Sequence, residues 1–396
     1  MHILRGEKKG YRDYAKSANV AIKKFRGHLN PHILSLSAVT PQGIFSQKNI
    51  ASVFSEALEL GEEDSRKLHL IFKNSKIEKR HSVIANSEDK FFKEGLFGNN
   101  FPNQVPCTYK RNQLYRIEAP KLCLKAASEA LQKWGQDPSK ITHVISVSCT
   151  GMYAPGLEFN LIKSLKLNAS VQRLGINFMG CFGAFKGLAI AKALAMENKN
   201  ARVLLVCTEL CSLHFQSDKT VEAFVANALF ADGAAAAIVG CDVQQNETSL
   251  FEIQKNQSFA LDDSEDQMSW EIANSGMLMK LSAKVPQLID AHIENFSNTL
   301  LNKTIPFSSC TWAIHPGGKA IVEAIEKRCA LTKDQTANAW DVLKNFGNMS
   351  SATFLFILNE LSKKKPLHEH VIGLGFGPGL SIEGILLKAN HEKTVV

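Results

Sequence analysis

The sequence has no run of 18 apolar residues, the length that a membrane-spanning helix needs, so no transmembrane helix is expected. Its basic N-terminus is not followed by an apolar segment, so a secretory signal peptide is not expected either. Nine cysteines in 396 residues are too few for a disulfide scaffold. Cys149, Cys207 and Cys241 lie inside apolar runs, which suit buried free thiols. These features predict a reducing, cytoplasmic compartment.

Outside the first 30 residues the chain has little excess of positive over negative charge. The net charge is +8, but residues 1–30 hold eight Lys or Arg against Glu7 and Asp13, which leaves only +2 for the rest of the chain. A basic surface that would bind nucleic acid is therefore not indicated. With 45% hydrophobic residues and 23 Phe, the chain can bury a large core, and intrinsic disorder is excluded for its bulk.

The basic N-terminal extension, residues 1–30, has a pattern of its own. Apolar residues recur at three- and four-residue steps between its lysines: Tyr11, Tyr14, Ala18, Ile22 and Phe25. This spacing is compatible with an amphipathic helix that makes a weak contact with a membrane surface or lies on the rest of the protein. It is also compatible with a frayed leader or an extended translation start.

From about residue 31 the pattern predicts one α/β body. Pro120 is expected to open a helix that ends at Gly135. The other predicted helices are 182–197, 280–296, 318–329 and 350–361, and the predicted strands are 143–149, 202–209, 234–240, 311–315, 371–375 and 381–387. Short apolar strands alternating with helices indicate buried, parallel or mixed sheets covered by helices. The similar order in each half suggests a duplicated fold.

Three element junctions carry reactive side chains. Cys181 lies between glycines at the start of a predicted helix, where unsatisfied amides favour a thiolate, although a buried structural cysteine is as good an interpretation. His315 ends an apolar strand and precedes Pro-Gly-Gly, which presents it to a crevice unless it is a hydrogen-bonded core histidine. Asn348 lies where a loop becomes a helix, so it is a candidate active-site amide or an N-cap.

Together the three residues form a coherent set. His315 could pair with a Cys181 thiolate, and imidazole and carboxamide donors could hold a thioester carbonyl and stabilise an enolate. Papain-like proteases use the same order of Cys, His and Asn, but the sequence around Cys181 lacks their Cys-Gly-Ser-Cys-Trp context.

Motifs spread over residues 120–387 carry a resemblance to a known family. They are Pro120-Lys-Leu, Trp134-Gly-Gln, Ser139-Lys-Ile-Thr-His143, Met179-Gly-Cys181-Phe, Leu229-Phe230-Ala-Asp232-Gly233-Ala, His315-Pro-Gly-Gly318, Gly347-Asn348-Met-Ser-Ser351 and Gly375-Phe-Gly-Pro-Gly379-Leu-Ser-Ile-Glu383. In this order they resemble the type III polyketide synthases, the chalcone-synthase-like enzymes of the thiolase fold. The last string separates that family from the related ketoacyl-carrier-protein synthases.

The resemblance implies a fold and a reaction. The fold would be thiolase-like, with two similar αβαβα halves in a layered α/β/α/β/α body: residues 31–250 carry the cysteine, and 251–396 carry the histidine and asparagine. Cys181 would accept a starter from an acyl-CoA, and His315 and Asn348 would promote decarboxylation of malonyl-CoA for a Claisen condensation that is repeated and ends in cyclisation. The family works as a homodimer, without a metal or a further cofactor.

The resemblance also implies substrate contacts. Phe230 would be the gatekeeper between the coenzyme A tunnel and a cavity lined by Cys149, Thr150, His214, Trp270, Met279 and Ser350. Coenzyme A would meet Lys67, Gly317 and Gly318, and its phosphates could meet the basic stretch of Lys67, Lys73, Lys76, Lys79 and Arg80, unless that stretch is a solvated helix face. Cys149 is either a second reactive thiol or buried and inert.

Two cavity positions depart from the plant enzymes. Trp270 stands where they have glycine, and His214 where they have threonine, so both should reduce the cavity volume. We therefore expect a bacterial-type enzyme that makes pyrones, resorcinols or phloroglucinol-like products from a fatty acyl or malonyl starter.

Other functions remain open on the sequence alone. A fatty-acid-type ketoacyl-carrier-protein synthase shares the three residues, and a non-catalytic thiolase-fold binding protein could retain them. The glycine-rich string at 375–379 precedes a strand, not a helix, which disfavours a dinucleotide site. The pairs Cys207 and Cys211, and His368 and His370, lack partners at zinc-like spacing, so no metal is expected.

Overall fold

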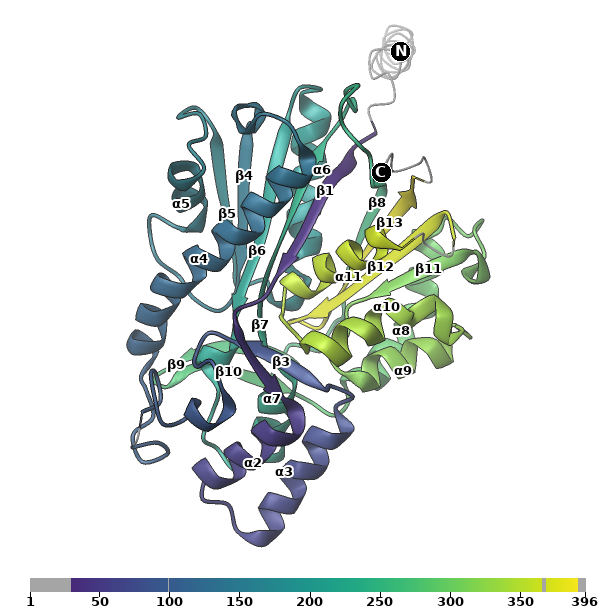
Figure 1. The fold of residues 1–396 in the computed structure, drawn as a ribbon. Helices are drawn as coiled ribbons and strands as arrows, with labels where there is room; N and C mark the ends of the chain where they lie inside the picture. The colour runs from purple at the N-terminus through teal and green to yellow at the C-terminus, as the bar shows by residue number, and fades with distance from the viewer. Residues whose placement is uncertain (1–29, 99, 365–367, 391–396) are drawn as a thin grey trace, which may run out of the picture.

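The computed structural model describes residues 30–98, 100–364 and 368–390. Nine strands form one mixed sheet in the order β11-β12-β13-β8-β1-β7-β6-β4-β5 (Figure 1). The N-terminal half supplies β1 (His32–Val39), β4 (His143–Ser148), β5 (Gln172–Asn177), β6 (Arg202–Leu210) and β7 (Asp232–Gly240). The C-terminal half supplies β8 (Phe251–Ala260), β11 (Cys310–Ile314), β12 (His370–Gly377) and β13 (Ser381–Ala389). The amphipathic helix considered for residues 1–30 lies, apart from Asn30, outside the described residues.

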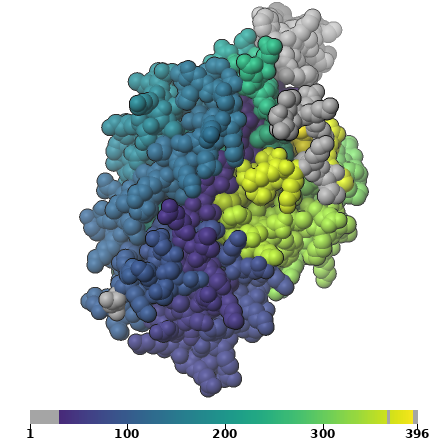
Figure 2. All heavy atoms as spheres, viewed as in Figure 1, coloured from purple at the N-terminus to yellow at the C-terminus, as the bar shows by residue number. Residues whose placement is uncertain are grey.

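The two halves are joined where β1 pairs with β8 through His32 and Ile33. Strand β4 runs parallel to β5 and β6, and β11 runs parallel to β12, while the other pairs in the sheet are antiparallel. The space-filling view shows the first described residues as a strip between the surfaces of the two halves (Figure 2). Because the strands of both halves are hydrogen-bonded together, the sheet is continuous across the boundary at residue 250.

Helices cover both faces of the sheet because the strands are apolar on both sides. Along β7, Ala234, Ala236 and Ile238 belong to the core under α4 (Thr108–Trp134) and α5 (Leu157–Ser164). The alternate residues of β7 belong to the core that holds α6 (Gly183–Glu197) and α11 (Ala352–Lys363). A mixed sheet covered by helices on both faces is the α/β architecture expected from the sequence.

Helices α6 and α11 lie at the centre of the molecule. Phe185 of α6 stacks on Phe354 of α11 with ring centroids 4.1 Å apart. These two rings also fill the space over glycines of β12, since a Cβ at Gly373 or Gly375 would collide with them. The outer face of the C-terminal strands carries α8 (Val285–Leu300), which contacts α9 (Lys319–Arg328), and α10 (Lys333–Phe346) packs against β11. The N-termini of both central helices therefore meet in the interior.

Two predicted boundaries are wrong. Helix α4 begins at Thr108, and Pro120 lies inside it. The first turns of α4 contribute Arg111, Tyr115 and Ala119 to its buried face, so an arginine sits where the periodicity predicts solvent. The predicted helix 280–296 begins only at Val285, because residues 276–281 form β10 (Gly276–Leu281), which pairs with β9 (Met268–Ala273).

A smaller region of helices and a two-stranded sheet packs at the end of the nine-stranded sheet where β7 begins. It contains α2 (Gln47–Ala57), α3 (Glu62–Asn74), α7 (Val221–Leu229) and the pair β2 (Gly43–Ser46) and β3 (Lys79–Ser82), which form the lower part of Figure 1. Phenylalanines from this region and from the loop that follows it form one cluster of ring contacts: Phe45, Phe54, Phe72, Phe91, Phe92, Phe97, Phe101 and Phe215. None of the described helices combines the length and apolar character that crossing a membrane requires.

Candidate active site

Cys181 lies in a tight turn between β5 and α6. Phe178 (φ 60°) and Gly180 (φ 73°) are both left-handed, and the turn continues as the short 3₁₀ segment Gly180–Phe182. A Cβ at Gly180 would stand 2.3 Å from Cδ of Pro378, so only glycine lets the turn approach the loop between β12 and β13. The glycine-rich string of the C-terminal half thus packs directly on the residues around Cys181.

Asn348 contacts Cys181 from the segment between α10 and α11. Its Nδ2 lies 4.0 Å from the Cys181 Sγ, and its Oδ1 accepts from the backbone N–H of Ser350 at 2.8 Å. Its backbone forms a parallel bridge with Phe230, through hydrogen bonds to the carbonyl of Leu229 and from the N–H of Ala231, both 2.9 Å. The N-cap of α11 is Ser351, so Asn348 is not the cap that one interpretation made it.

His315 follows β11 and is fully buried. Among the described residues, neither of its ring nitrogens has a hydrogen-bond partner. The alternative interpretation, a hydrogen-bonded core histidine, is therefore wrong. Its loop reaches the other two residues indirectly: a Cβ on Gly318 would lie 3.6 Å from Leu229, whose carbonyl accepts from Asn348. No hydrogen bond joins the His315 side chain to Cys181 or Asn348.

Burial keeps the cysteine and histidine neutral. Desolvation raises the pKa of Cys181 to about 11, against hydrogen bonds with Ser350 and Asn348 that favour the thiolate. Desolvation also lowers the pKa of His315 to about 3. The helix N-terminus was expected to favour a Cys181 thiolate, but here the cost of burying the charge outweighs that effect. Burial therefore disfavours both the thiolate and the imidazolium at this site.

The cavity beside Cys181 is small, about 10 Å³. Its walls include five of the six predicted cavity residues and the predicted gatekeeper: Cys149, Thr150, Phe230, Trp270, Met279 and Ser350. The sixth, His214, lines a neighbouring cavity of about 170 Å³. Cys211, Phe230, Trp270 and Met279 line both cavities and separate them.

Trp270 and His214 are tied to the same backbone segment. Trp270 Nε1 donates to the carbonyl of Cys149 at 2.9 Å. His214 Nε2 lies 2.8 Å from the carbonyl of Thr150, and its Nδ1 accepts from the N–H of Met277 at 3.1 Å. Burial lowers the pKa of His214 to about 4, which agrees with this neutral tautomer. Both side chains therefore act as fixed walls.

Cys149 is engaged in the turn before Cys181. Its Sγ accepts from the N–H of Gly180 at 3.0 Å, and burial raises its pKa well above the usual range for a thiol. A protonated, hydrogen-bonded thiol favours the inert interpretation of Cys149.

Glu209 is a buried carboxyl group that sequence reasoning missed. It ends the apolar strand β6 and accepts from the N–H of Cys149 at 2.9 Å, the hydroxyl of Thr150 at 2.8 Å and the hydroxyl of Ser351. Burial raises its pKa to about 7. The signal was available, because a charged residue at the carboxyl end of a buried strand is a candidate for a site.

An apolar groove of about 480 Å³ lies between α3, α7 and the loop before α9. Gly317 and Gly318 line this groove. Leu229, the residue that precedes Phe230, lines it as well. Lys67 does not line it: its Nζ pairs with Glu63 at 2.7 Å and Asp64 at 3.4 Å on the same helix. Arg80, placed with the phosphate-facing lysines from the sequence, is instead 4% exposed, so that interpretation is wrong for this residue.

No cluster of three or more His, Cys, Asp or Glu side chains that could hold a metal ion occurs in residues 30–98, 100–364 and 368–390. The structure brings the Cys181 thiol and the Asn348 carboxamide into contact, and it buries the His315 imidazole without a hydrogen-bond partner among the described residues.

Comparisons with known proteins agree with this assignment. The family model of the chalcone and stilbene synthases matches with its N-terminal domain over residues 20–243 and its C-terminal domain over residues 252–390. "Probable polyketide synthase 1" of Dictyostelium discoideum is 35% identical over 371 residues, which cover 92% of this chain but 12% of that relative. The chain therefore spans about an eighth of the length of that protein.

A solved structure is similar throughout. The crystal structure of the C-terminal type III polyketide synthase domain of Steely1, a type I/III hybrid from Dictyostelium, has a TM-score of 0.86 and 35% identity, covering 91% of this chain and 99% of that one. Fold and matches define the class, a thiolase-fold acyltransferase of decarboxylative Claisen condensation. The chain belongs to the chalcone and stilbene synthase family of type III polyketide synthases, which use coenzyme A thioesters and need no further cofactor. These matches favour this family over the carrier-protein-dependent and non-catalytic alternatives.

Proposed function

We propose that Cys181, His315 and Asn348 are the catalytic residues of this synthase. The observation that carries the proposal is the contact of Asn348 with Cys181, together with the full burial of the His315 imidazole, which has no hydrogen-bond partner among the described residues. A buried polar group without a partner is costly, and a substrate carbonyl would satisfy it. The neutral states of Cys181 and His315 fit a site in which proton transfer accompanies substrate binding.

In the loading step, His315 takes the proton of the Cys181 thiol as its sulfur attacks the carbonyl of an acyl-CoA. The bond between that carbonyl and the coenzyme A sulfur breaks, and coenzyme A leaves with the proton from His315. The starter is then held on Cys181 as a thioester.

In the extension step, the N–H groups of His315 and Asn348 donate to the thioester carbonyl of malonyl-CoA. Carbon dioxide leaves, and the electron pair of the broken C–C bond forms an enolate that these donors stabilise in a dry site. The enolate carbon attacks the Cys181 thioester, a C–C bond forms, and the Cys181 thiolate is released. The Cys181 thiolate then attacks the thioester carbonyl of the lengthened chain, the bond to the coenzyme A sulfur breaks, coenzyme A leaves, and the cycle can repeat.

We also propose that coenzyme A occupies the 480 Å³ groove and that Phe230 separates it from the cavity. Gly317 and Gly318 would let the pantetheine arm approach closely, and Leu229 leads from the groove to Phe230. Lys67 is a weaker candidate contact, since Glu63 and Asp64 already hold it.

For the product we keep the proposal of a pyrone, resorcinol or phloroglucinol made from a fatty acyl or malonyl starter by a bacterial-type enzyme. The support is Trp270, which lines the cavity beside Cys181 and takes up volume that a bulky aromatic starter would need. Efficient conversion of p-coumaroyl-CoA to a chalcone would contradict it.

The decisive experiment is incubation of the purified protein with malonyl-CoA and a panel of starter acyl-CoAs, beside Cys181→Ala, with products read by mass spectrometry. We expect masses that grow by two-carbon ketide units and are absent with the variant. If only malonyl groups on a carrier protein were accepted, the fatty-acid-type synthase would replace this proposal.

A homodimer is proposed from the edge of the sheet. Strand β5 is the last strand, and Leu174 on it is 40% exposed, as is the nearby Met152. A cleft of about 700 Å³ lined by Tyr153, Glu158 and Arg173 lies beside it. An open edge with exposed apolar residues needs a cover, and a second copy would supply one. Sedimentation equilibrium should give twice the monomer mass, whereas a monomer at micromolar concentration would contradict the proposal.

The division into 1–30, 31–250 and 251–396 and the cytoplasmic location are likewise proposals. Because one core cluster holds residues of both halves, such as Phe185 and Phe354, we expect residues 31–250 expressed alone to aggregate.

Co-sedimentation of the full chain with anionic liposomes, compared with a chain that lacks residues 1–30, tests the weak membrane contact.

A further inference from the structure

Arg80 is a buried arginine that the reaction described above does not use. It lies on β3 and is 4% exposed. Its Nε donates to Oε1 of Gln47 at 2.8 Å, and its Nη1 donates to the backbone carbonyls of Asn227 and Phe230, both at 2.7 Å. Among the residues that the structure describes, no carboxylate forms an ion pair with it, and the one whose charge acts on it is Asp232. Burial lowers its pKa to about 9, while the charge of Asp232 opposes this shift. A buried arginine bonded to carbonyls fixes backbone positions.

The carbonyls that Arg80 binds belong to the end of α7 and to Phe230. The last carbonyls of a helix have no partner within the helix. Here each one is satisfied: Ala226 by the N–H of Phe230, Asn227 by Arg80, Ala228 by Nε2 of Gln47, and Leu229 by the N–H of Asn348. The carbonyl of Phe230, one residue beyond the helix, is again held by Arg80. Arg80 and Asn348 therefore hold adjacent carbonyls of the segment that carries Phe230.

Arg80 also touches the other side of the Phe230–Asn348 bridge. Gly347 precedes Asn348 with φ 71°, and a Cβ there would stand 3.0 Å from Cγ of Arg80. The rings of Phe72 and Phe215 lie 5.6 and 5.8 Å from the guanidinium carbon. The packing of Gly347, Phe72 and Phe215 therefore holds the Arg80 side chain in place, and its N–H donors in turn hold the Phe230 side of the Phe230–Asn348 bridge.

We propose that Arg80 is a positioning residue that sets Phe230 against Asn348, and through them the opening between the groove and the Cys181 thiol. This inference rests on the proposed roles of Phe230 and Asn348. A lysine cannot replace the fork, because one ammonium on a flexible stem cannot span Gln47 and two carbonyls in a fixed plane.

The test compares Arg80→Lys with Arg202→Lys, a matched change at a buried arginine that lies at the opposite end of β6. For the proposed reaction we expect Arg80→Lys to lower kcat about 10-fold to 100-fold, with KM for malonyl-CoA changed less than threefold. We also expect a larger share of products released after fewer extensions. Arg202→Lys should lower the thermal midpoint but leave kcat of the folded protein and the product ratio unchanged. Wild-type kcat and products from Arg80→Lys, or equal changes in both variants, would overturn the proposal.

A second measurement needs no turnover. The rate of Cys181 alkylation by iodoacetamide, followed by mass spectrometry of the Cys181 peptide, reports access to the thiol. We expect Arg80→Lys to raise this rate at least threefold, whereas Arg202→Lys leaves it unchanged. If the wild-type protein condensed no thioester, the proposed reaction would fail, yet an altered alkylation rate would still support the positioning role. An unaltered rate would refute it.

A gentler variant covers the case in which Arg80→Lys does not fold. Gln47→Met keeps the side-chain volume and removes one partner of Arg80 and one of the Ala228 carbonyl. It should shift kcat, product ratio and alkylation rate in the same direction by a smaller factor, about twofold to fivefold. No shift in any of the three would overturn the proposal.

Discussion

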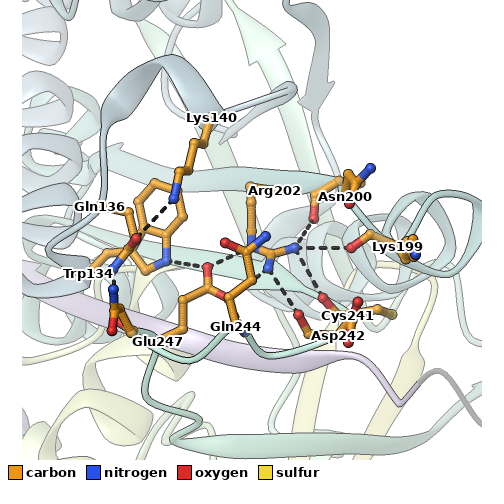
Figure 3. A network of polar contacts seen from close by, with 12 residues as sticks. Trp134, Gln136, Lys140, Lys199, Asn200, Arg202, Cys241, Asp242, Gln244 and Glu247 are labelled. Atoms are coloured by element: carbon orange, nitrogen blue, oxygen red, sulfur yellow. Dashed lines mark hydrogen bonds and ion pairs between the residues drawn. The ribbon is translucent and has the colours of Figure 1, made fainter.

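The two ends of the strand pair β6–β7 each bury an arginine, and the two are held in different ways. At one end Arg202 is bound bidentately by Glu247, at 2.7 and 2.6 Å, and also donates to carbonyls such as those of Cys241 and Asp242 (Figure 3). At the other end Arg80 has Gln47 and two backbone carbonyls but no bound carboxylate. Eight residue steps along β6, about 26 Å at the usual rise, separate these ends.

The two arginines differ in whether a carboxylate neutralises their charge. Glu247 neutralises Arg202 locally and also accepts from Nε1 of Trp134 at 2.9 Å, so this network closes on itself around the loop 241–247. Asp232, whose charge acts on Arg80, is hydrogen-bonded elsewhere, to Ser212 and Val83. Charges left uncompensated in the interior are typical of functional sites, whereas a closed ion pair serves the fold.

The largest effect is expected from breaking the closed pair. Glu247→Gln leaves the charge of Arg202 buried without its partner, which should destabilise the protein by about 3–5 kcal/mol. Urea unfolding followed by circular dichroism measures this loss. At a temperature where the variant is still folded, kcat should equal that of the wild type, and a fall in kcat would break the distinction between the two ends.

A pH effect of opposite sign sharpens the comparison. Burial raises the pKa of Glu209 to about 7, so the folded protein binds this proton more tightly than the unfolded chain, and stability from this group falls as pH rises from about 4.5 to 7. For Glu247, burial acts to raise the pKa, but hydrogen bonds from Arg202 and Gln244 outweigh it and lower the pKa. Its contribution is therefore lost as pH falls.

The measurement is the unfolding free energy of wild type minus that of Glu209→Gln, taken at several pH values. The difference should grow in favour of the wild type by up to about 3 kcal/mol as pH falls from 7 to 4.5. The same difference taken with Glu247→Gln should stay nearly constant over that range and shrink only below about pH 4.5, because the lowered pKa of Glu247 lies below that value. Parallel profiles for the two variants would contradict the assignment.

The smallest effect comes from two tryptophans that donate equivalent hydrogen bonds. Trp270→Phe loses the bond to the Cys149 carbonyl, and Trp134→Phe loses the bond to Glu247, so each should cost about 1–2 kcal/mol. Only Trp270→Phe should change function, because its ring divides the two cavities, and it should shift preference toward bulkier starters. Competition between hexanoyl-CoA and p-coumaroyl-CoA, read by mass spectrometry, checks this, and an unchanged preference would argue against Trp270 as a wall.

Sequence reasoning succeeded where burial and local pattern coincide. Strands such as 143–149 and 202–209 are short segments rich in apolar and β-branched residues, and the glycines around Cys181 and after His315 mark turns that the structure contains. It failed where a polar residue is buried, because periodicity assigns such residues to solvent. The start of α4 was missed because Arg111 lies on its buried face, and the buried Arg80 was grouped with exposed lysines. It also could not weigh desolvation against the helix dipole at Cys181, since burial depends on the loop at Pro378.

The packing of Pro378 on the turn at Gly180 has a consequence for the order in which the protein is made. The thiol belongs to the first half of the chain, but the loop that covers its turn is translated about 200 residues later, which takes roughly 10–40 s at ordinary synthesis rates. The turn at Gly180 in the nascent N-terminal half therefore stays uncovered until β12 and β13 of the C-terminal half have been translated. A chain that stops before Pro378 lacks this cover, so the fold does not shield the turn of Cys181 during that interval.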